Sequence, residues 1–77
     1  MSDILAVLGR NIKYYRSKLG MTQEELAQKA DINRSYLAGL ERGRRNTTIK
    51  TLEALAKALD VSPMDLLEST EHDRGDE

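Results

Sequence analysis

The sequence contains no cysteine, no tryptophan and no phenylalanine, and it has one proline and three tyrosines among 77 residues. Without disulfides, a chain of this size depends on close packing of regular elements for its stability. The single histidine, His72, has no partner at metal-ligand spacing, so we expect no metal site and no cofactor. The lack of cysteine also fits a reducing compartment, and we expect a cytoplasmic protein.

Long apolar runs are also missing. After Met1, Ser2 and Asp3 come only five consecutive apolar residues, from Ile4 to Leu8. This start has no basic segment and is far too short to cross a bilayer, so we expect neither a signal peptide nor a membrane helix. Catalytic patterns are absent as well: the sequence has no phosphate-binding glycine loop and no convincing nucleophile–base pair, which argues against an enzyme.

Charge is distributed unevenly along the chain. The formal net charge is -1, but residues 1–64 carry eleven Lys and Arg against seven Asp and Glu, whereas residues 65–77 carry six acids and one Arg. The stretch from Arg34 to Lys50 holds five basic residues and one acid, Glu41. Because phosphate binding depends on the local charge, the overall net charge does not exclude a nucleic-acid partner.

Apolar residues recur at helical spacing throughout, and the sequence shows no strand pattern. Gly20 and Gly43 are typical of positions just after a helix, and Thr22, Asn33, Thr48 and Ser62 are typical of positions just before one. The sequence therefore predicts an all-α domain over residues 1–68, followed by an acidic, disordered tail over residues 69–77. The expected helices cover residues 5–19, 23–30, 34–42, 49–59 and 63–67. Leu19 and Ile49 are expected to face the core.

The segment from Thr22 to Arg42 predicts two short amphipathic helices joined by a tight turn. At that turn Asp31 is expected to adopt positive φ, which Asp tolerates better than most residues. The residues expected to face inward are Leu26, Ala27, Ala30, Ile32, Leu37 and Leu40. Those expected on the outer face of the second helix are Asn33, Arg34, Ser35, Ala38, Gly39 and Arg42. Small residues and forked donors on such a face suit the major groove of DNA.

Three segments together carry a family resemblance: Gly20–Ala27 (G-M-T-Q-E-E-L-A), Leu40–Gly43 (L-E-R-G) and a Ser-Pro pair at Ser62. They resemble the Cro/repressor-like (XRE) DNA-binding family, which implies a five-helix lambda-repressor-like fold from about Leu8 to Leu67. The run N-R-S-Y-L-A-G-L-E-R-G-R-R-N over residues 33–46 is similar to that of restriction–modification controller proteins, which are small dimeric regulators. Asp31 departs from the family pattern, in which many members have glycine, and the acidic tail matches nothing assigned.

These observations predict a set of DNA-contacting residues, each with a simpler alternative as an ordinary solvated or helix-packing residue. The base-contacting candidates, at the start of the helix expected to enter the groove, are Arg34, Ser35 and Tyr36. The candidates for the DNA backbone are Gln23, Asn33, Gly39, Arg42, Arg44, Arg45, Asn46 and Thr47. Gly39 lies inside a predicted helix, where glycine costs about 1 kcal/mol relative to alanine, and close approach to DNA would explain it.

The resemblance further implies an ion pair between Arg16 and Glu41, with two exposed charges as the alternative. Val61, Met64 and Leu67 add apolar area beyond the needs of a small core, and we expect them to form a homodimer interface. Glu24 is a candidate for contact with RNA polymerase, because this position lies against polymerase in lambda-type repressors; the alternative is an acid favoured by the helix dipole.

The sequence as a whole predicts a dimeric, sequence-specific DNA-binding transcriptional regulator that binds a two-fold symmetric double-stranded operator, and the resemblance favours a controller of restriction–modification genes. Two alternatives stay open. One is an antitoxin or phage-type repressor on the same fold, and the other is a protein-interaction module whose helix-turn-helix does not bind DNA.

Overall fold

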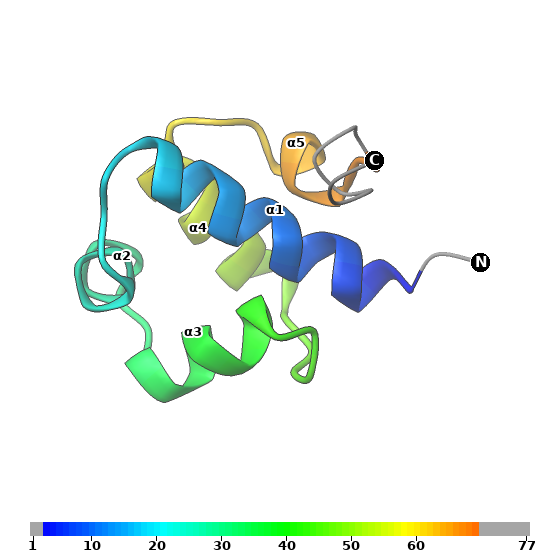
Figure 1. Cartoon of the computed structure of the whole chain (residues 1–77), viewed down its shortest axis with the longest axis horizontal. Coiled ribbons are helices and arrows are strands. Elements are labelled where there is room, and N and C mark those ends of the chain that lie inside the picture. Colours follow the sequence, from blue (N-terminus) through cyan, green and yellow to red (C-terminus); the bar gives the residue numbers. More distant parts are fainter. Residues whose placement is uncertain (1–2, 70–77) are drawn as a thin grey trace.

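The computed structural model describes residues 3–69, which form five α-helices and no strand (Figure 1). The helices are α1 (Ile4–Lys18), α2 (Gln23–Ala30), α3 (Arg34–Glu41), α4 (Ile49–Leu59) and α5 (Pro63–Leu67). The expected all-α, five-helix architecture is therefore confirmed. Apart from Ser69, the predicted acidic tail lies outside the described residues. No helix in the described part of the chain is long and apolar enough to cross a membrane.

Local signals in the sequence set the helix boundaries. Thr22 and Glu25 form a reciprocal capping box at the start of α2, and Ser62 and Asp65 form another at the start of α5, where Pro63 is the first helical residue. Asp31, with φ of 59°, ends α2 in the left-handed conformation that its position in the turn requires, as expected from the sequence. The chain can therefore reverse direction between α2 and α3 without a glycine.

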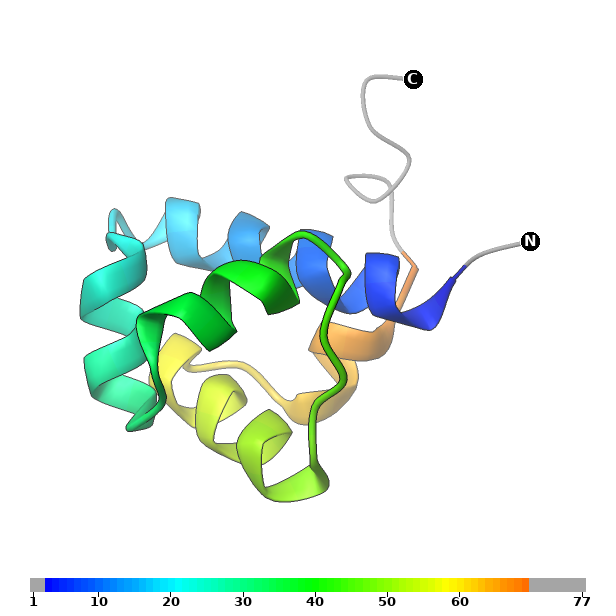
Figure 2. The same cartoon turned by 90° about the horizontal axis from the view of Figure 1, so that it is seen from below.

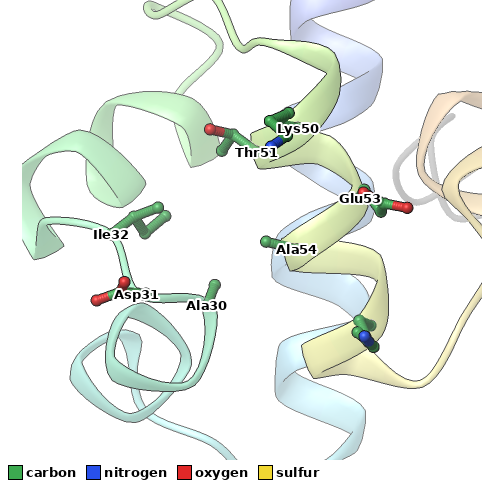
Figure 3. Close-up of a pocket in the computed structure, with 8 residues that line it drawn as sticks. Ala30, Asp31, Ile32, Lys50, Thr51, Glu53 and Ala54 are labelled. Carbon is green, nitrogen blue, oxygen red and sulfur yellow. The ribbon is translucent and has the colours of Figure 1, made fainter.

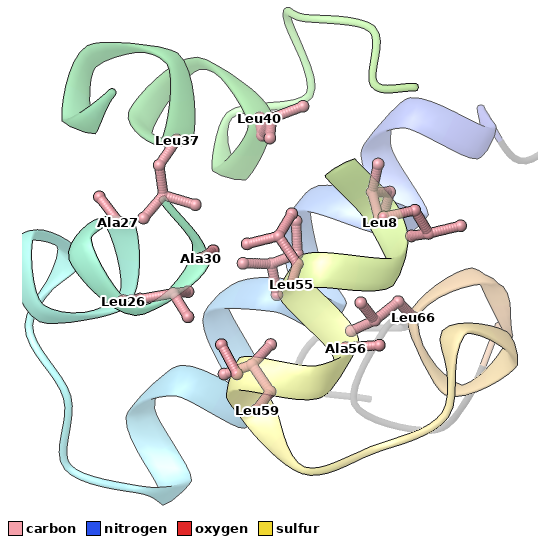
Figure 4. Close-up of a cluster of buried hydrophobic side chains, with 13 residues drawn as sticks. Leu8, Leu26, Ala27, Ala30, Leu37, Leu40, Leu55, Ala56, Leu59 and Leu66 are labelled. Carbon is pink, nitrogen blue, oxygen red and sulfur yellow. The ribbon is translucent and has the colours of Figure 1, made fainter. Parts of the chain in front are cut away.

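The core is built from one stripe of each helix (Figure 4). Helix α1 packs against α3 and α5, while α2 packs against α3 and α4. The large side chains at its centre are fully buried: Ile12, Leu26, Leu37, Leu40, Leu55 and Leu66. Leu37 and Leu40 are buried and pack α3 against the core, while the first turn of this helix lies at the surface. Figure 2 shows α3 lying across one face of the molecule, with the loop to α4 running down beside it.

Two residues of α1 that the sequence analysis did not single out fix how the other helices dock. Gly9 lies against the end of α3, where an added Cβ would overlap the carbonyl oxygen of Leu40 and lie 2.6 Å from that of Glu41. Asn11 is fully buried and donates from Nδ2 to the carbonyl oxygens of Leu66 and Glu68, each at 2.9 Å. The two hydrogen bonds from Asn11 give α5, a helix of five residues, partners for carbonyl groups at its C-terminal end.

Two expectations about the core are wrong. Leu19 and Ile49 were expected to face inward, but they are 52% and 81% exposed. Leu19 follows the last residue of α1 and Ile49 is the first residue of α4. Each residue therefore continues the apolar spacing of its helix but lies at a helix end, where its side chain is largely in contact with solvent.

Candidate DNA interface

The start of α3 is an exposed, positively charged helical turn. Asn33 caps the helix, and its Oδ1 accepts hydrogen bonds from the backbone N–H groups of Ser35 at 2.7 Å and Tyr36 at 3.2 Å. With this oxygen occupied, the side-chain NH₂ of Asn33 is the group left to donate to a phosphate. Arg34 and Ser35 follow directly and are both exposed. The structure therefore places these candidate DNA-contacting residues together at one surface.

Tyr36 is half-buried and connects α3 to the loop that follows the helix. Its hydroxyl donates to the backbone carbonyl of Asn46 at 2.7 Å, and the guanidinium of Arg45 lies 5.1 Å from the centre of its ring. A cation over an aromatic face at this distance is attracted by the ring quadrupole. In the unbound protein, Tyr36 thus shapes the loop, and a base contact by this residue stays a prediction.

Gly39 is buried, but the residue that covers it is the exposed loop residue Arg45 and not the core, so its predicted place on the outer face of α3 is not contradicted. The side chain of Arg45 lies across it, and an added Cβ would overlap the Cγ atom of Arg45. A glycine here forms a notch that lets the aliphatic part of Arg45 cross the helix and bring its guanidinium to Tyr36. The crossing of Arg45 therefore explains why a glycine stands at this position. A direct approach of Gly39 to DNA would require the Arg45 side chain to move.

The loop between α3 and α4 supplies the other basic residues. Arg42 ends α3, and Arg44, Arg45 and Asn46 follow it with exposed side chains, whereas Thr47 is half-buried. Thr48 then caps α4 by accepting from the backbone N–H of Thr51. The exposed basic residues of this loop and of the start of α3 are Arg34, Arg42, Arg44 and Arg45, and we call them the basic face.

Glu41, the one acid in this stretch, is turned inward and neutralised. Its Oε2 lies 2.6 Å from Nε of Arg16 and its Oε1 lies 2.9 Å from Nη2, which makes a two-bond ion pair between α3 and α1. The pair implied by the family resemblance is therefore present, with side-chain exposures of 14% for Arg16 and 4% for Glu41. The hydrogen bonds that Arg16 donates to Glu41 raise the pKa of Arg16, against a smaller opposing effect of burial. Glu41 therefore adds no exposed negative charge among the arginines of this stretch.

The ion pair extends to the start of α2. Nε2 of Gln23 donates to Oε1 of Glu41 at 3.0 Å, and Nη1 of Arg34 lies 3.5 Å from Oε1 of Gln23. From the sequence, Gln23, Glu41 and Arg34 were expected to have separate roles, and the structure connects them. Helical spacing could not have predicted these two contacts. They link the last and first residues of α3 through Gln23, which belongs to α2.

A pocket of about 440 Å³ lies on a different part of the surface, between the α2–α3 turn and α4 (Figure 3). Ile32 and Ala54 line it together with charged residues of both signs, among them Asp31 and Lys50. None of the predicted DNA-contacting residues lines this pocket. Among the described residues, no group of three or more His, Cys, Asp or Glu side chains is arranged to hold a metal ion.

Two short helices joined by a turn, the second with a basic, exposed first turn and a basic loop after it, define a helix-turn-helix protein of the DNA-binding class. Sequence comparison leads to the same class, since the helix-turn-helix family matches residues 12–66. The control protein C.BamHI of Bacillus amyloliquefaciens is 40% identical over 70 residues, which cover 90% of this chain and 86% of that protein.

Solved structures give the same result. The restriction–modification controller protein C.AhdI from Aeromonas hydrophila has a TM-score of 0.78 and 39% identity, covering 80% of this chain and 94% of that chain. The controller C.Esp1396I, solved as a tetramer in complex with its natural 35 base-pair operator, has a TM-score of 0.76 and 44% identity, covering 86% and 87%. The chain belongs to the XRE-type helix-turn-helix family of transcription regulators, and it is close to the restriction–modification controller proteins.

Proposed function

We propose that this protein binds a specific double-stranded DNA operator as a homodimer, with α3 of each copy in the major groove. The proposal is carried by two observations together: the exposed arginines of the basic face, and the pairing of Glu41, the one acid between Arg34 and Lys50 in the sequence, with Arg16. Arg34 and Ser35 present donors at the position from which a helix contacts base edges. Tyr36 is the third candidate for a base contact, and it would have to release Asn46 or contact DNA with its ring edge.

The proposed backbone contacts surround this turn. Gln23 at the start of α2, Asn33 at the cap of α3 and the loop residues Arg42, Arg44, Arg45, Asn46 and Thr47 offer donors suited to phosphate oxygens. Such contacts fix the register of the protein on the duplex, while base contacts supply the sequence preference. We assign the DNA-binding unit to residues 1–68.

The proposed dimer interface lies on α5 and the turn before it. Met64 is 75% exposed and Leu67 is 39% exposed, whereas Val61 is half-buried against the core and can contribute only its outer edge. Apolar side chains exposed on a short helix suit a two-fold contact, in which each copy presents the same surface. A dimer would give two recognition helices and so match a two-fold symmetric operator. The related C.Esp1396I binds its operator as a tetramer, so association of copies on DNA is seen in a relative.

The similarity to C.BamHI and C.AhdI supports a role in controlling restriction–modification genes. Selection of bound duplexes from a random library tests the DNA-binding proposal directly, because a dimer of this kind should return a two-fold symmetric consensus. A library that returns no consensus would instead favour a protein-interaction module. Neighbouring genes for a methyltransferase and an endonuclease would support the controller role, and a neighbouring toxin gene would favour an antitoxin.

Glu24 is exposed beside Gln23, where an acid at the edge of the DNA-binding surface can meet a basic surface of RNA polymerase. If Glu24 has this role, Glu24→Gln should leave operator affinity nearly unchanged and reduce transcription from an activated promoter. Parallel loss of binding and transcription, or no change in either, would remove Glu24 from the proposal.

A regulator of this kind acts where the DNA is, in the cytoplasm, and the function proposed here involves no catalysis.

A further inference from the structure

The contacts of Gln23 connect the buried ion pair to the exposed first turn of α3. We propose that Glu41 is a positioning residue for base contact by Arg34, because it fixes the orientation of the Gln23 side-chain amide, which in turn holds the Arg34 guanidinium. This inference rests on the proposed function, in which Arg34 contacts a base. It assigns to Glu41 a role in sequence preference in addition to its structural link to Arg16.

The donor and acceptor chemistry allows only one orientation of the Gln23 amide. Its partner on one side is the Glu41 carboxylate, which only accepts hydrogen bonds, so the NH₂ group must face it, and Nε2 lies 3.0 Å from Oε1. Its partner on the other side is the Arg34 guanidinium, which only donates, so the amide oxygen must face it. The reversed amide would place oxygen against carboxylate and NH₂ against guanidinium, and both contacts would be repulsive.

The Glu41 carboxylate is itself held in place. Two hydrogen bonds from Arg16 fix its plane, and Arg16 Nη1 also donates to the Met21 carbonyl at 2.9 Å, just before α2 begins. Glu41 is only 4% exposed, so water does not compete strongly for Oε1. A fixed carboxylate therefore gives a fixed amide at the start of α2.

The last contact, from Arg34 to Gln23, is exposed and long at 3.5 Å. It adds little to folding stability, but it restricts a side chain that otherwise has many rotamers. Because the contact is weak, a guanine in the groove can replace the amide oxygen as acceptor, while the second proton of the Gln23 NH₂ group is available to a phosphate. The amide thus orders Arg34 before DNA arrives and releases it to the base.

The first test uses the protein without DNA. Gln23→Met removes both polar groups at similar side-chain length and leaves the Arg16–Glu41 pair intact, so the fold should be kept. We expect NMR relaxation at Nε of Arg34 to show greater mobility in Gln23→Met. Gln28→Met, on the exposed side of the same helix, is the matched control and should leave Arg34 unchanged. Unchanged mobility in Gln23→Met overturns the proposal.

The second test uses DNA and asks whether Glu41 acts through Gln23. A site selected from a random duplex library defines the preferred sequence, and the base whose preference disappears in Arg34→Ala marks the position that Arg34 contacts. At a temperature where circular dichroism shows full folding, Glu41→Gln should reduce the preference at that base by about three- to tenfold. The same change in the Gln23→Met background should cause no further reduction, because the path from Glu41 to Arg34 is already broken.

Equal reductions in both backgrounds would give Glu41 a structural role alone and overturn the proposal. If Glu41→Gln does not fold, the mobility of Arg34 and the base preference in Gln23→Met decide the outcome. Failure of the proposed function has a different result: Arg34→Ala would weaken binding to every duplex equally, and both the base contact and this inference would then be wrong.

Discussion

At the residue scale, Arg34 is the side chain on which we expect sequence preference to depend most. It is the first residue of α3 and is exposed, and an arginine can donate two parallel hydrogen bonds to a guanine edge. We expect Arg34→Ala to weaken binding to the preferred duplex by about 1–3 kcal/mol and to flatten the base preference at one position of each half-site. Competition binding against single-base variants of the duplex measures both effects. Equal weakening on all duplexes would assign Arg34 to phosphate instead.

Gly39 offers a second prediction at this scale, in which stability and binding change in opposite directions. Alanine is favoured over glycine inside a helix by about 1 kcal/mol, but its Cβ would displace Arg45 from the notch on α3. We therefore expect Gly39→Ala to keep or raise the melting temperature and to lower DNA affinity.

The control for Gly39→Ala is Arg45→Ala. If Gly39 acts through Arg45, the double variant should bind DNA no more weakly than Arg45→Ala alone. An affinity of Gly39→Ala equal to that of the wild type would show that the position of Arg45 across α3 is not needed for binding.

Residue-level contacts were only partly predictable from the sequence. The αL conformation of Asp31 followed from its position in a turn without glycine. The crossing of Arg45 over Gly39 did not, because helical spacing says nothing about a loop side chain that folds back on its helix. Asn11 was missed for a similar reason: its acceptors, the carbonyl groups of Leu66 and Glu68, are more than fifty residues away in the chain.

At the scale of elements, the Arg16–Glu41 pair is the polar link between α1 and α3. Removing only the acid leaves a largely buried guanidinium without its partner, and loss of one member of such a pair costs about 3–5 kcal/mol. Because Arg16 retains some contact with water, we expect Glu41→Ala to lower the free energy of unfolding by about 3 kcal/mol, at the lower end of this range. Urea unfolding measures this difference.

Glu53→Ala serves as the comparison, since Glu53 is an exposed acid on α4 and its removal should change stability little. If Glu41→Ala and Glu53→Ala unfold at nearly the same urea concentration, the ion pair contributes little to holding α1 against α3.

The number and order of helices were predictable, because apolar spacing and capping residues agree along the whole described chain. Errors about which apolar residues of the helices face the core were confined to helix ends. Leu19 and Ile49 continue the apolar pattern of their helices but are exposed at the helix ends, and the pattern alone cannot show how far along a helix the packing continues. The residues of the basic face were also predictable from the sequence. The pairing of Glu41 with Arg16 was predicted only from the family resemblance.

At the scale of the whole molecule, self-association determines whether one or two recognition helices meet the DNA. Leu67 lies on α5 with its side chain partly exposed, next to the fully buried Leu66. We expect Leu67→Glu to place like charges on both sides of a two-fold axis and to convert dimers into monomers, with a large loss of operator affinity. Sedimentation velocity measures the change in association state.

Leu19→Glu is the matched control, because Leu19 is an equally apolar, exposed leucine at the far end of α1. It should leave the dimer unchanged. A Leu67→Glu variant that remains dimeric would move the interface away from α5.

The central claim, sequence-specific DNA binding through the basic face, is tested most directly by affinity for a selected duplex and a scrambled duplex over a range of salt concentrations. We predict that the logarithm of the association constant falls linearly with the logarithm of the salt concentration for both duplexes. The slope should be about -0.9 for each phosphate contact. We also predict that the selected duplex stays at least about a thousandfold tighter. Binding that does not depend on salt, or equal affinity for the two duplexes, would contradict the account.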